Sequence, residues 1–127
     1  MGSSPICPTK IVMGPEYHKK GWGYEMWLHN DEKYCGKLLY FDKGKRCSYH
    51  YHKLKYETFY LQSGMIQLRH SYDNDLQAAA VEILMPGDTF EILPNLRHEM
   101  LALKDSELFE FSTQHFETDS YRIVKGD

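Results

Sequence analysis

Histidines and one glutamate, at fixed distances along the chain, are the residues of this sequence whose types best suit metal chemistry. His50 and His52 are separated by one residue, and four residues separate His52 from Glu57. With 7 histidines in 127 residues, about 0.4 His-x-His pairs arise by chance, so the pair alone is weak evidence. Five residues separate Gly44 from His50, and six separate Glu57 from Gly64. Requiring all these residues together lowers the chance expectation to roughly one in several thousand.

A β-strand explains this spacing physically. Successive side chains of a strand point to opposite faces, so His50 and His52 would project to one side about 7 Å apart. After a short turn, Glu57 would enter the same cavity from the neighbouring strand. We predict His98 as the fourth ligand, because it follows a turn, a strand and a Pro-Asn turn and begins the next strand. The alternative for His98 is an ordinary histidine on a surface turn.

Imidazole and carboxylate ligands suit Fe, Mn, Ni, Co or Zn in the divalent state. Four protein ligands leave open positions on an octahedral ion, which is typical of a catalytic rather than a closed structural site.

Short strands separated by turns must position these ligands. Alternating and apolar runs predict eight strands, the number in a jelly roll, at 37–41, 47–52, 57–62, 65–70, 79–85, 89–93, 98–102 and 107–113. The turns between them contain Gly44, Gly64 and Gly87. The sequence therefore predicts one all-β domain over 16–127 with an N-terminal arm over 1–15, and one helical turn at 16–20.

Composition excludes several classes of protein. The net charge is −3 and the basic residues are scattered, so no cationic surface for nucleic acid is expected. No apolar run is long enough to cross a membrane, and the N-terminus lacks the pattern of a secretory signal. Three cysteines, Cys7, Cys35 and Cys47, without metal-type spacing indicate reduced thiols and a cytoplasmic protein. Cys47 is interpreted as a small buried side chain rather than a functional thiol.

The segments 44–64 and 87–98 resemble the two motifs of the cupin superfamily. The second has Pro94-Asn95-Leu96 where cupins usually have a Pro-x-Gly turn, and Asn95 can adopt the left-handed conformation that the glycine would provide. Within the cupins the chain is most similar to small single-domain relatives of type II mannose-6-phosphate isomerase. The similar segments are 21–25 (Gly-Trp-Gly-Tyr-Glu), Lys37, 48–52 (Ser-Tyr-His-Tyr-His), 110–113 (Glu-Phe-Ser-Thr) and 119–122 (Asp-Ser-Tyr-Arg). His50 replaces a glutamine ligand of that family.

The resemblance implies a single cupin jelly-roll barrel, or double-stranded β-helix, that binds one divalent metal ion (Zn, Mn, Fe or Ni). His50 in place of glutamine shifts the expected preference towards Fe or Mn. The resemblance also implies a homodimer. The expected small-molecule substrate is a sugar or sugar phosphate that is isomerised through an enediol. An Fe-dependent dioxygenase and a non-catalytic sugar-binding module remain alternatives, because a fold does not fix a reaction.

Further side chains are candidates for catalysis or substrate binding. Lys37 is the predicted base, because strand parity can point it into the cavity where burial favours a neutral amine. His115 follows the last core strand and could line the cavity mouth. Arg122, and also Arg69 and Lys55, could bind a phosphate or an acidic sugar through charge-assisted hydrogen bonds. For each of them a solvated surface position is the alternative.

Overall fold

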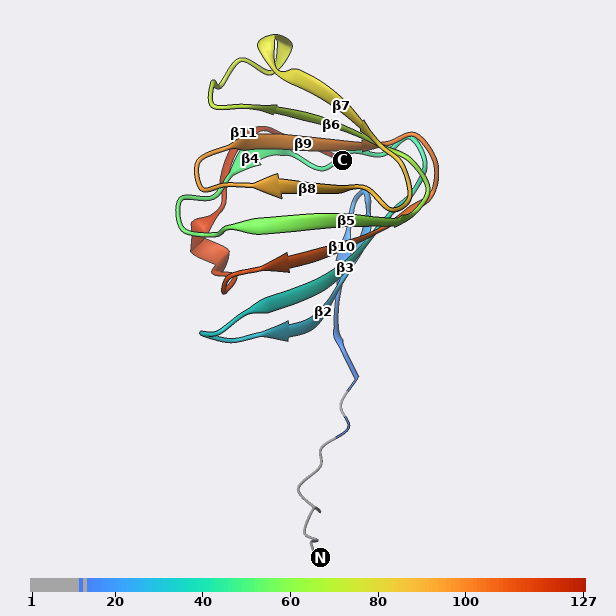
Figure 1. The fold of residues 1–127 in the computed structure, drawn as a ribbon, viewed down its shortest axis with the longest axis vertical. Helices are drawn as coiled ribbons and strands as arrows, with labels where there is room; N and C mark the ends of the chain where they lie inside the picture. Colours follow the sequence, from blue (N-terminus) through green and yellow to red (C-terminus); the bar gives the residue numbers. More distant parts are fainter. Residues whose placement is uncertain (1–11, 13) are drawn as a thin grey trace, which may run out of the picture.

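Two antiparallel β-sheets form the fold (Figure 1). The structure, a computed structural model, describes residue 12 and residues 14–127. The six-stranded sheet has the order β1 (Glu16–Lys20), β2 (Gly23–Asn30), β3 (Cys35–Phe41), β10 (Ser106–Ser112), β5 (Glu57–Ser63) and β8 (Thr89–Ile92). The five-stranded sheet has the order β11 (Tyr121–Val124), β4 (Tyr49–Tyr51), β9 (Arg97–Ala102), β6 (Ile66–Ser71) and β7 (Ala80–Leu84). Two single turns of 3-10 helix, η2 (Leu76–Ala78) and η3 (Glu117–Asp119), complete the described elements.

Strands that are distant in sequence are neighbours in both sheets. β10 lies between β3 and β5, and β9 lies between β4 and β6. This connectivity is that of a jelly roll, so the prediction of a single all-β barrel is confirmed. It also brings the segment that follows β4 close to the start of β5 and of β9, where the candidate ligands lie.

All eight predicted strands are present, within a few residues of the expected bounds, and three further strands were missed. β1, β2 and β11 were not predicted, and the helical turn expected at 16–20 is wrong, because β1 pairs along its whole length with β2. A single helical turn leaves most of its backbone groups unpaired, whereas a hairpin satisfies them. Most of the predicted arm, 1–15, lies outside the described residues.

The barrel interior has an apolar end and a polar end. Along β5, β3 and β10 the inward positions change from charged to apolar: Glu57 precedes Phe59 and Leu61, Lys37 precedes Leu39 and Phe41, and Glu110 follows Leu108. The apolar end is filled by residues from both sheets, including Ile66, Leu68, Met100 and Ala102. Buried charged groups are costly unless they are paired, so the polar end must satisfy its own groups.

Two turns fix how the strands enter the site. Gly64 has a φ of 93°, and a Cβ atom there would overlap Ser106, so the β5–β6 turn requires glycine. Asn95 has a φ of 73°, the left-handed conformation predicted for it. Its backbone N–H donates to the carbonyl oxygen of His52 over 2.7 Å. The turn before β9 is therefore tied to the histidine segment.

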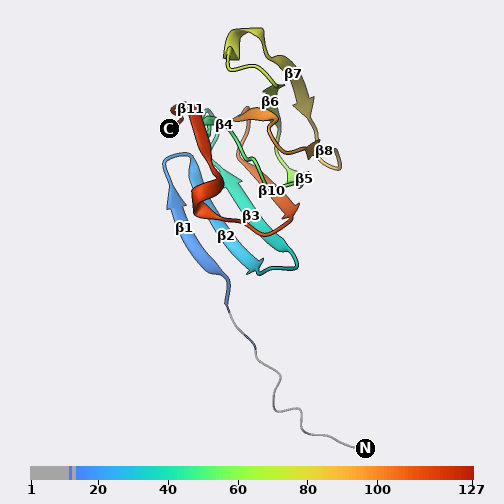
Figure 2. The same cartoon turned by 90° about the vertical axis from the view of Figure 1, so that its left-hand side faces the viewer.

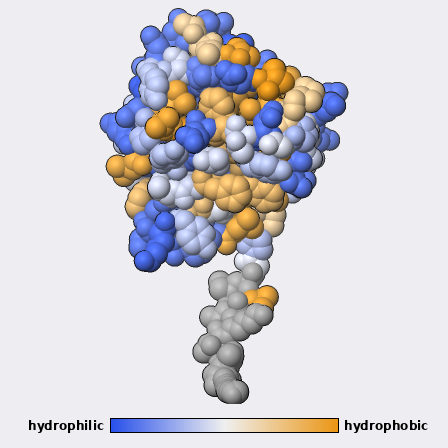
Figure 3. Space-filling view, in the orientation of Figure 1, coloured by the Kyte–Doolittle hydropathy of each residue, from blue (hydrophilic) through white to orange (hydrophobic). Residues whose placement is uncertain are grey.

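The outer face of the six-stranded sheet carries apolar side chains, which gather over β10, β3 and β2 in Figure 3. Leu38 pairs in register with both Met26 and Phe109, so the three form a row across these strands. Phe111 and Leu28, on the same face, are more than half exposed. The homodimer stays a prediction. The described residues include no helix long and apolar enough to span a membrane.

Candidate metal centre and its cavity

Three histidines meet at the polar end of the barrel. His50 on β4 is the register partner of His98 on β9, and His52 follows two residues after His50. The ring centroids lie 4.4 Å apart for His50 and His98 and 5.1 Å apart for His50 and His52. One ring nitrogen from each histidine lies within 4.8 Å of the other two. The structure thus brings together the three histidines that the sequence singled out, with their rings facing one another.

Each of these rings is oriented by its own backbone hydrogen bond. The Nδ1 atoms contact carbonyl oxygens, in the pairs His50–Ser48 (2.8 Å), His52–Asp119 (2.6 Å) and His98–Leu96 (2.9 Å). A carbonyl oxygen can only accept, so each Nδ1 must carry the proton. The Nε2 atoms therefore keep their lone pairs, which is how metal-binding histidines are held in proteins.

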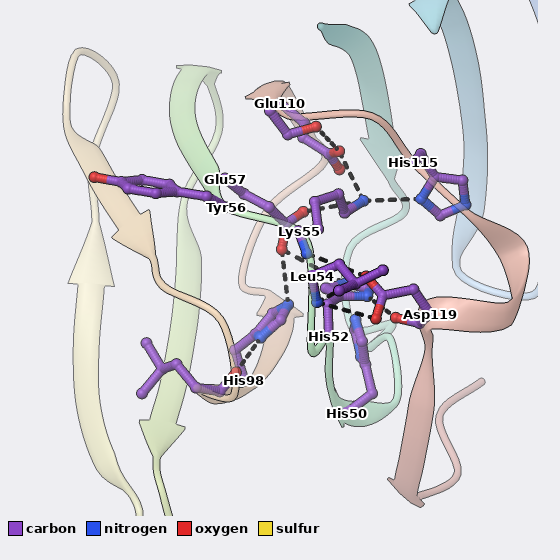
Figure 4. Close-up of polar contacts among 12 residues, drawn as sticks. His50, His52, Leu54, Lys55, Tyr56, Glu57, His98, Glu110, His115 and Asp119 are labelled. Carbon is purple, nitrogen blue, oxygen red and sulfur yellow. Dashed lines mark hydrogen bonds and ion pairs between the residues drawn. The ribbon is translucent and has the colours of Figure 1, made fainter. Parts of the chain in front are cut away.

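Glu57 completes the cluster from the start of β5 (Figure 4). Its Oε2 atom lies 3.5 Å from Nε2 of His52 and 3.6 Å from Nε2 of His98. This oxygen is buried and has no hydrogen-bond partner among the described residues. When Glu57 is ionised, lone pairs on oxygen and nitrogen face one another, an arrangement that a proton on Glu57 or a cation between the groups relieves. The donor set fits a divalent metal ion.

Burial opposes charge on each of these four side chains. It lowers the pKa of His50 to about 4, that of His52 to about 3, and that of His98 well below the usual value. It also raises the pKa of Glu57 to about 8, with a further contribution from the nearby carboxylate of Glu110. The histidines are therefore neutral at pH 7, the state in which imidazole binds a metal.

Asp119, at the end of η3, shapes the turn between His52 and Glu57. Its carboxylate accepts the backbone N–H groups of residues 53–55, the shortest from Lys53 over 2.8 Å. Its carbonyl oxygen accepts from His52, as described above. In Figure 2 η3 and β11 lie over β2 and β3, at the side of the barrel that holds this turn. Sequence reasoning gave Asp119 no role, although it lies in one of the segments that carried the resemblance.

Lys55 is buried beside the cluster rather than exposed for substrate. Its Nζ atom lies 2.9 Å from Oε2 of Glu110, 2.9 Å from Nδ1 of His115 and 3.4 Å from Oε1 of Glu57. Burial alone would lower the pKa of Lys55, but the carboxylates of Glu57 and Glu110 outweigh it and raise that pKa. Against the cost of burial, Lys55 and Lys37 hold the pKa of Glu110 well below its usual range. Lys55 was predicted to bind a phosphate. In the structure its ammonium group already contacts protein partners.

Glu110→Ala is expected to lower the free energy of unfolding by about 3–5 kcal/mol, because it removes the partner of a buried ammonium. Urea denaturation at pH 7 measures this loss. Glu107→Ala is the matched control, since Glu107 lies on the same strand but on its outer face, and we expect it to cost less than about 1 kcal/mol. Equal losses in the two variants would contradict the assignment of Glu110 as a structural counter-ion.

Lys37 is buried, as the parity argument expected, and it has a carboxylate partner. Its Nζ atom lies 3.3 Å from Oε1 of Glu25 and 4.5 Å from the ring centroid of Trp27. Trp27 donates its indole N–H to the same oxygen over 2.8 Å. Burial raises the pKa of Glu25, but Lys37 and Trp27 more than offset this, and the net shift is downward. The role of Lys37 as the base stays a prediction, and the Glu25 carboxylate beside it is a second candidate for that role.

A cavity of about 310 Å³ connects these groups. It is lined by the four candidate ligands, by Lys37, Glu25, Lys55, Glu110 and His115, and by three exposed basic residues, Lys20, Arg122 and Lys125. The size and the convergent polar groups are those of a small-molecule site.

Not every candidate residue reaches this cavity. Arg69 does not line it, because Ile66 and Leu68 point inward from β6 and parity places Arg69 on the outer face, opposite Glu99 in register. Cys47 does line it, but as a buried core residue whose thiol has its pKa raised to about 12 by burial. Glu25 was missed because the sequence was not interpreted as a strand at β2.

Comparison with solved structures shows which fold the chain has, whereas comparison of sequences found no relative. No protein-family description matches the chain, and no curated protein matches it in sequence. Among solved structures, CapF, the capsular polysaccharide assembling protein of Staphylococcus aureus, superposes with a TM-score of 0.75 at 16% identity, covering 87% of this chain and 34% of that one. The chain thus spans about a third of CapF.

Two smaller proteins match over most of their own length. KdgF from Halomonas has a TM-score of 0.69 at 16% identity, with 81% of this chain and 91% of that chain covered. An RmlC-like cupin from Shewanella frigidimarina has a TM-score of 0.69 at 19% identity, with 82% and 87% covered. The strand order and these superpositions show that the chain has the jelly-roll fold of the RmlC-like cupins.

Proposed function

We propose that the chain binds one divalent transition-metal ion through His50, His52, His98 and Glu57. The observation that carries this proposal is the buried Oε2 atom of Glu57, unpaired and facing two imidazole nitrogens that have no proton to donate. Zn, Mn, Fe and Ni all suit such a donor set. A bound ion with open positions would stabilise negative charge that develops on a substrate oxygen.

We propose further that the protein is an enzyme that isomerises a sugar or sugar phosphate. The cavity offers carboxylates and cationic donors together, which suits a substrate rich in hydroxyl groups. The exposed basic residues Lys20, Arg122 and Lys125 at its edge suit a phosphate. A structural neighbour is described as a capsular polysaccharide assembling protein, and the resemblance of sequence segments to the mannose-6-phosphate isomerase family, which stays a prediction, suggests a sugar as well.

Aldose–ketose isomerisation moves a proton between adjacent carbons, and the Lys37–Glu25 pair can carry out this transfer. The Glu25 carboxylate would accept the proton from the carbon beside the carbonyl group. The Lys37 ammonium, 3.3 Å from Glu25, would donate a hydrogen bond to the substrate oxygen on which charge develops. To form the enediol, the carbonyl oxygen would take a proton from the Lys37 ammonium. The other oxygen would then give its hydroxyl proton back to Lys37 while Glu25 returns its proton to the neighbouring carbon, so that no proton is gained or lost.

Elemental analysis of the purified protein, followed by an NMR screen of hexoses and hexose phosphates with the metal found, tests both proposals. We expect about one metal ion per chain and aldose–ketose turnover of at least one compound. Absence of metal after incubation with Zn, Mn, Fe and Ni salts would refute the metal site. Oxygen uptake with Fe and no sugar turnover would instead indicate a dioxygenase. Saturable sugar binding without turnover under any metal would indicate a binding module.

A further inference from the structure

We infer that Lys55 is a positioning residue with two targets: it turns one oxygen of Glu57 towards the histidines, and it fixes His115 as an N–H donor to an oxygen of the ligand. The ligand chemistry implied is a hydroxyl or carbonyl oxygen near the Lys37 side of the cavity. The Glu57 half of the inference rests on the proposed metal site, and the His115 half stands independently of it.

Two hydrogen bonds, to Glu110 and His115, and an ion pair with Glu57 hold the ammonium group of Lys55. Three partners surround Nζ, namely Glu110, His115 and Glu57. An ammonium has three N–H donors and no lone pair, so each of the three contacts can only be one in which Lys55 donates. Glu110 is itself anchored, because the hydroxyl of Ser112 donates to the same oxygen over 2.9 Å. Lys55 is therefore held in place by protein groups on three sides.

As a consequence, the two carboxylate oxygens of Glu57 face different partners. Oε1 lies on the Lys55 side at 3.4 Å, and Oε2 lies on the side of His52 and His98. With Oε1 held by an ammonium, only Oε2 is presented to the histidines (Figure 4). Glu57 therefore offers one oxygen, which leaves more room for other ligands than a carboxylate that uses both.

The consequence for His115 is a defined tautomer. Its Nδ1 accepts from Lys55, and a neutral imidazole has one N–H, so the proton must be on Nε2. Burial, with Lys55 second, lowers the pKa of His115 to about 4, which keeps the ring neutral. Asn30 holds the backbone of His115 through two hydrogen bonds of 2.8 and 3.1 Å, and the ring packs edge-on against Trp27. His115 thus lines the cavity as a rigid donor.

This tautomer is opposite to that of His50, His52 and His98, which carry the proton on Nδ1. The difference can be measured in the wild-type protein without any substrate. In a long-range ¹H–¹⁵N spectrum of histidine-labelled protein, without metal and with Zn, we expect His115 to be in the Nε2–H form. Its signals should vanish in His115→Phe. A His115 that carries its proton on Nδ1, or that averages between tautomers, would overturn the inference.

A double variant tests whether Lys55 fixes the tautomer of His115 and the orientation of Glu57. Lys55→Met/Glu110→Gln removes the ammonium together with the charge that it neutralises, so the fold is not left with an unpaired carboxylate at Glu110. We expect His115 to lose its single tautomer and the Kd for Zn to rise about 10–100-fold, as for other groups that orient metal ligands. Lys53→Met, in the same turn but with an exposed side chain, should change neither.

Each half of the inference can fail by itself. An unchanged His115 tautomer in the double variant would refute its control by Lys55, and an unchanged Kd for Zn would refute the positioning of Glu57. A wild-type protein that binds none of Zn, Mn, Fe and Ni would refute the proposed metal site instead, and the tautomer measurement would remain decisive for His115.

Discussion

In His52→Ala, bound metal is expected to fall below about one tenth of the wild-type content. The substitution removes one of three imidazole donors and also the ring that spans from Asp119 to the space in front of Glu57. Groups that merely orient a ligand change metal affinity about 10–100-fold, so loss of a ligand should exceed that effect. Elemental analysis after exhaustive dialysis against a weak chelator gives the metal content directly.

His70→Ala is the matched control. His70 pairs in register with His98 on the adjacent strand, but its ring contacts Glu82 and it does not line the cavity. Removing it should leave the metal content unchanged. If His52→Ala kept a stoichiometric ion while remaining folded, the ligands would be misassigned, and the facing arrangement of Glu57 and the histidines would need another explanation.

The strands from β3 to β10 could be predicted because apolar and polar residues alternate along many of them and because turn residues separate them. Asn95 illustrates this, since its left-handed conformation was expected from its residue type together with the Pro-x-Gly turn that cupins usually have there. β2 shows where this fails. Its inward face carries Glu25 and Trp27 and its outward face Tyr24 and Met26, so neither polarity nor hydrophobicity alternates along it. Only its pairing with β1 and β3 makes it a strand.

The candidate ligands could be chosen from spacing and turn residues because all four lie on short strands or next to one. The groups that orient them could not. The contact of Lys55 with Glu110 depends on how β10 aligns with β5, where Ser112 lies opposite Glu57, and this register connects residues far apart in the chain. Arg69 is different, because parity with Ile66 and Leu68 was available in the sequence and would have placed it on the outer face.

Lys37→Met is expected to reduce kcat about 10²–10⁴-fold, the range typical of removing a proton-transferring group, while KM stays close to the wild-type value. The reason is that Lys37 is a buried cationic donor of the cavity and lies closer to the Glu25 carboxylate, at 3.3 Å, than the exposed Lys20 does, at 3.9 Å. Lys55 is fully engaged by protein groups and cannot replace it. Steady-state kinetics on the sugar identified by the screen, with the native metal, measure the change.

Metal content and folding should be retained in Lys37→Met. Glu110 keeps its closest cation, Lys55, and Glu25 keeps the indole donor of Trp27. Elemental analysis and a urea denaturation curve therefore separate a chemical role from a structural one. Lys33→Met, on the exposed turn between β2 and β3, controls for the loss of a lysine and should leave kcat unaltered. A Lys37→Met protein with normal metal and normal turnover would show that proton transfer is carried out without Lys37, and it would leave the Glu25 carboxylate as the group to test next.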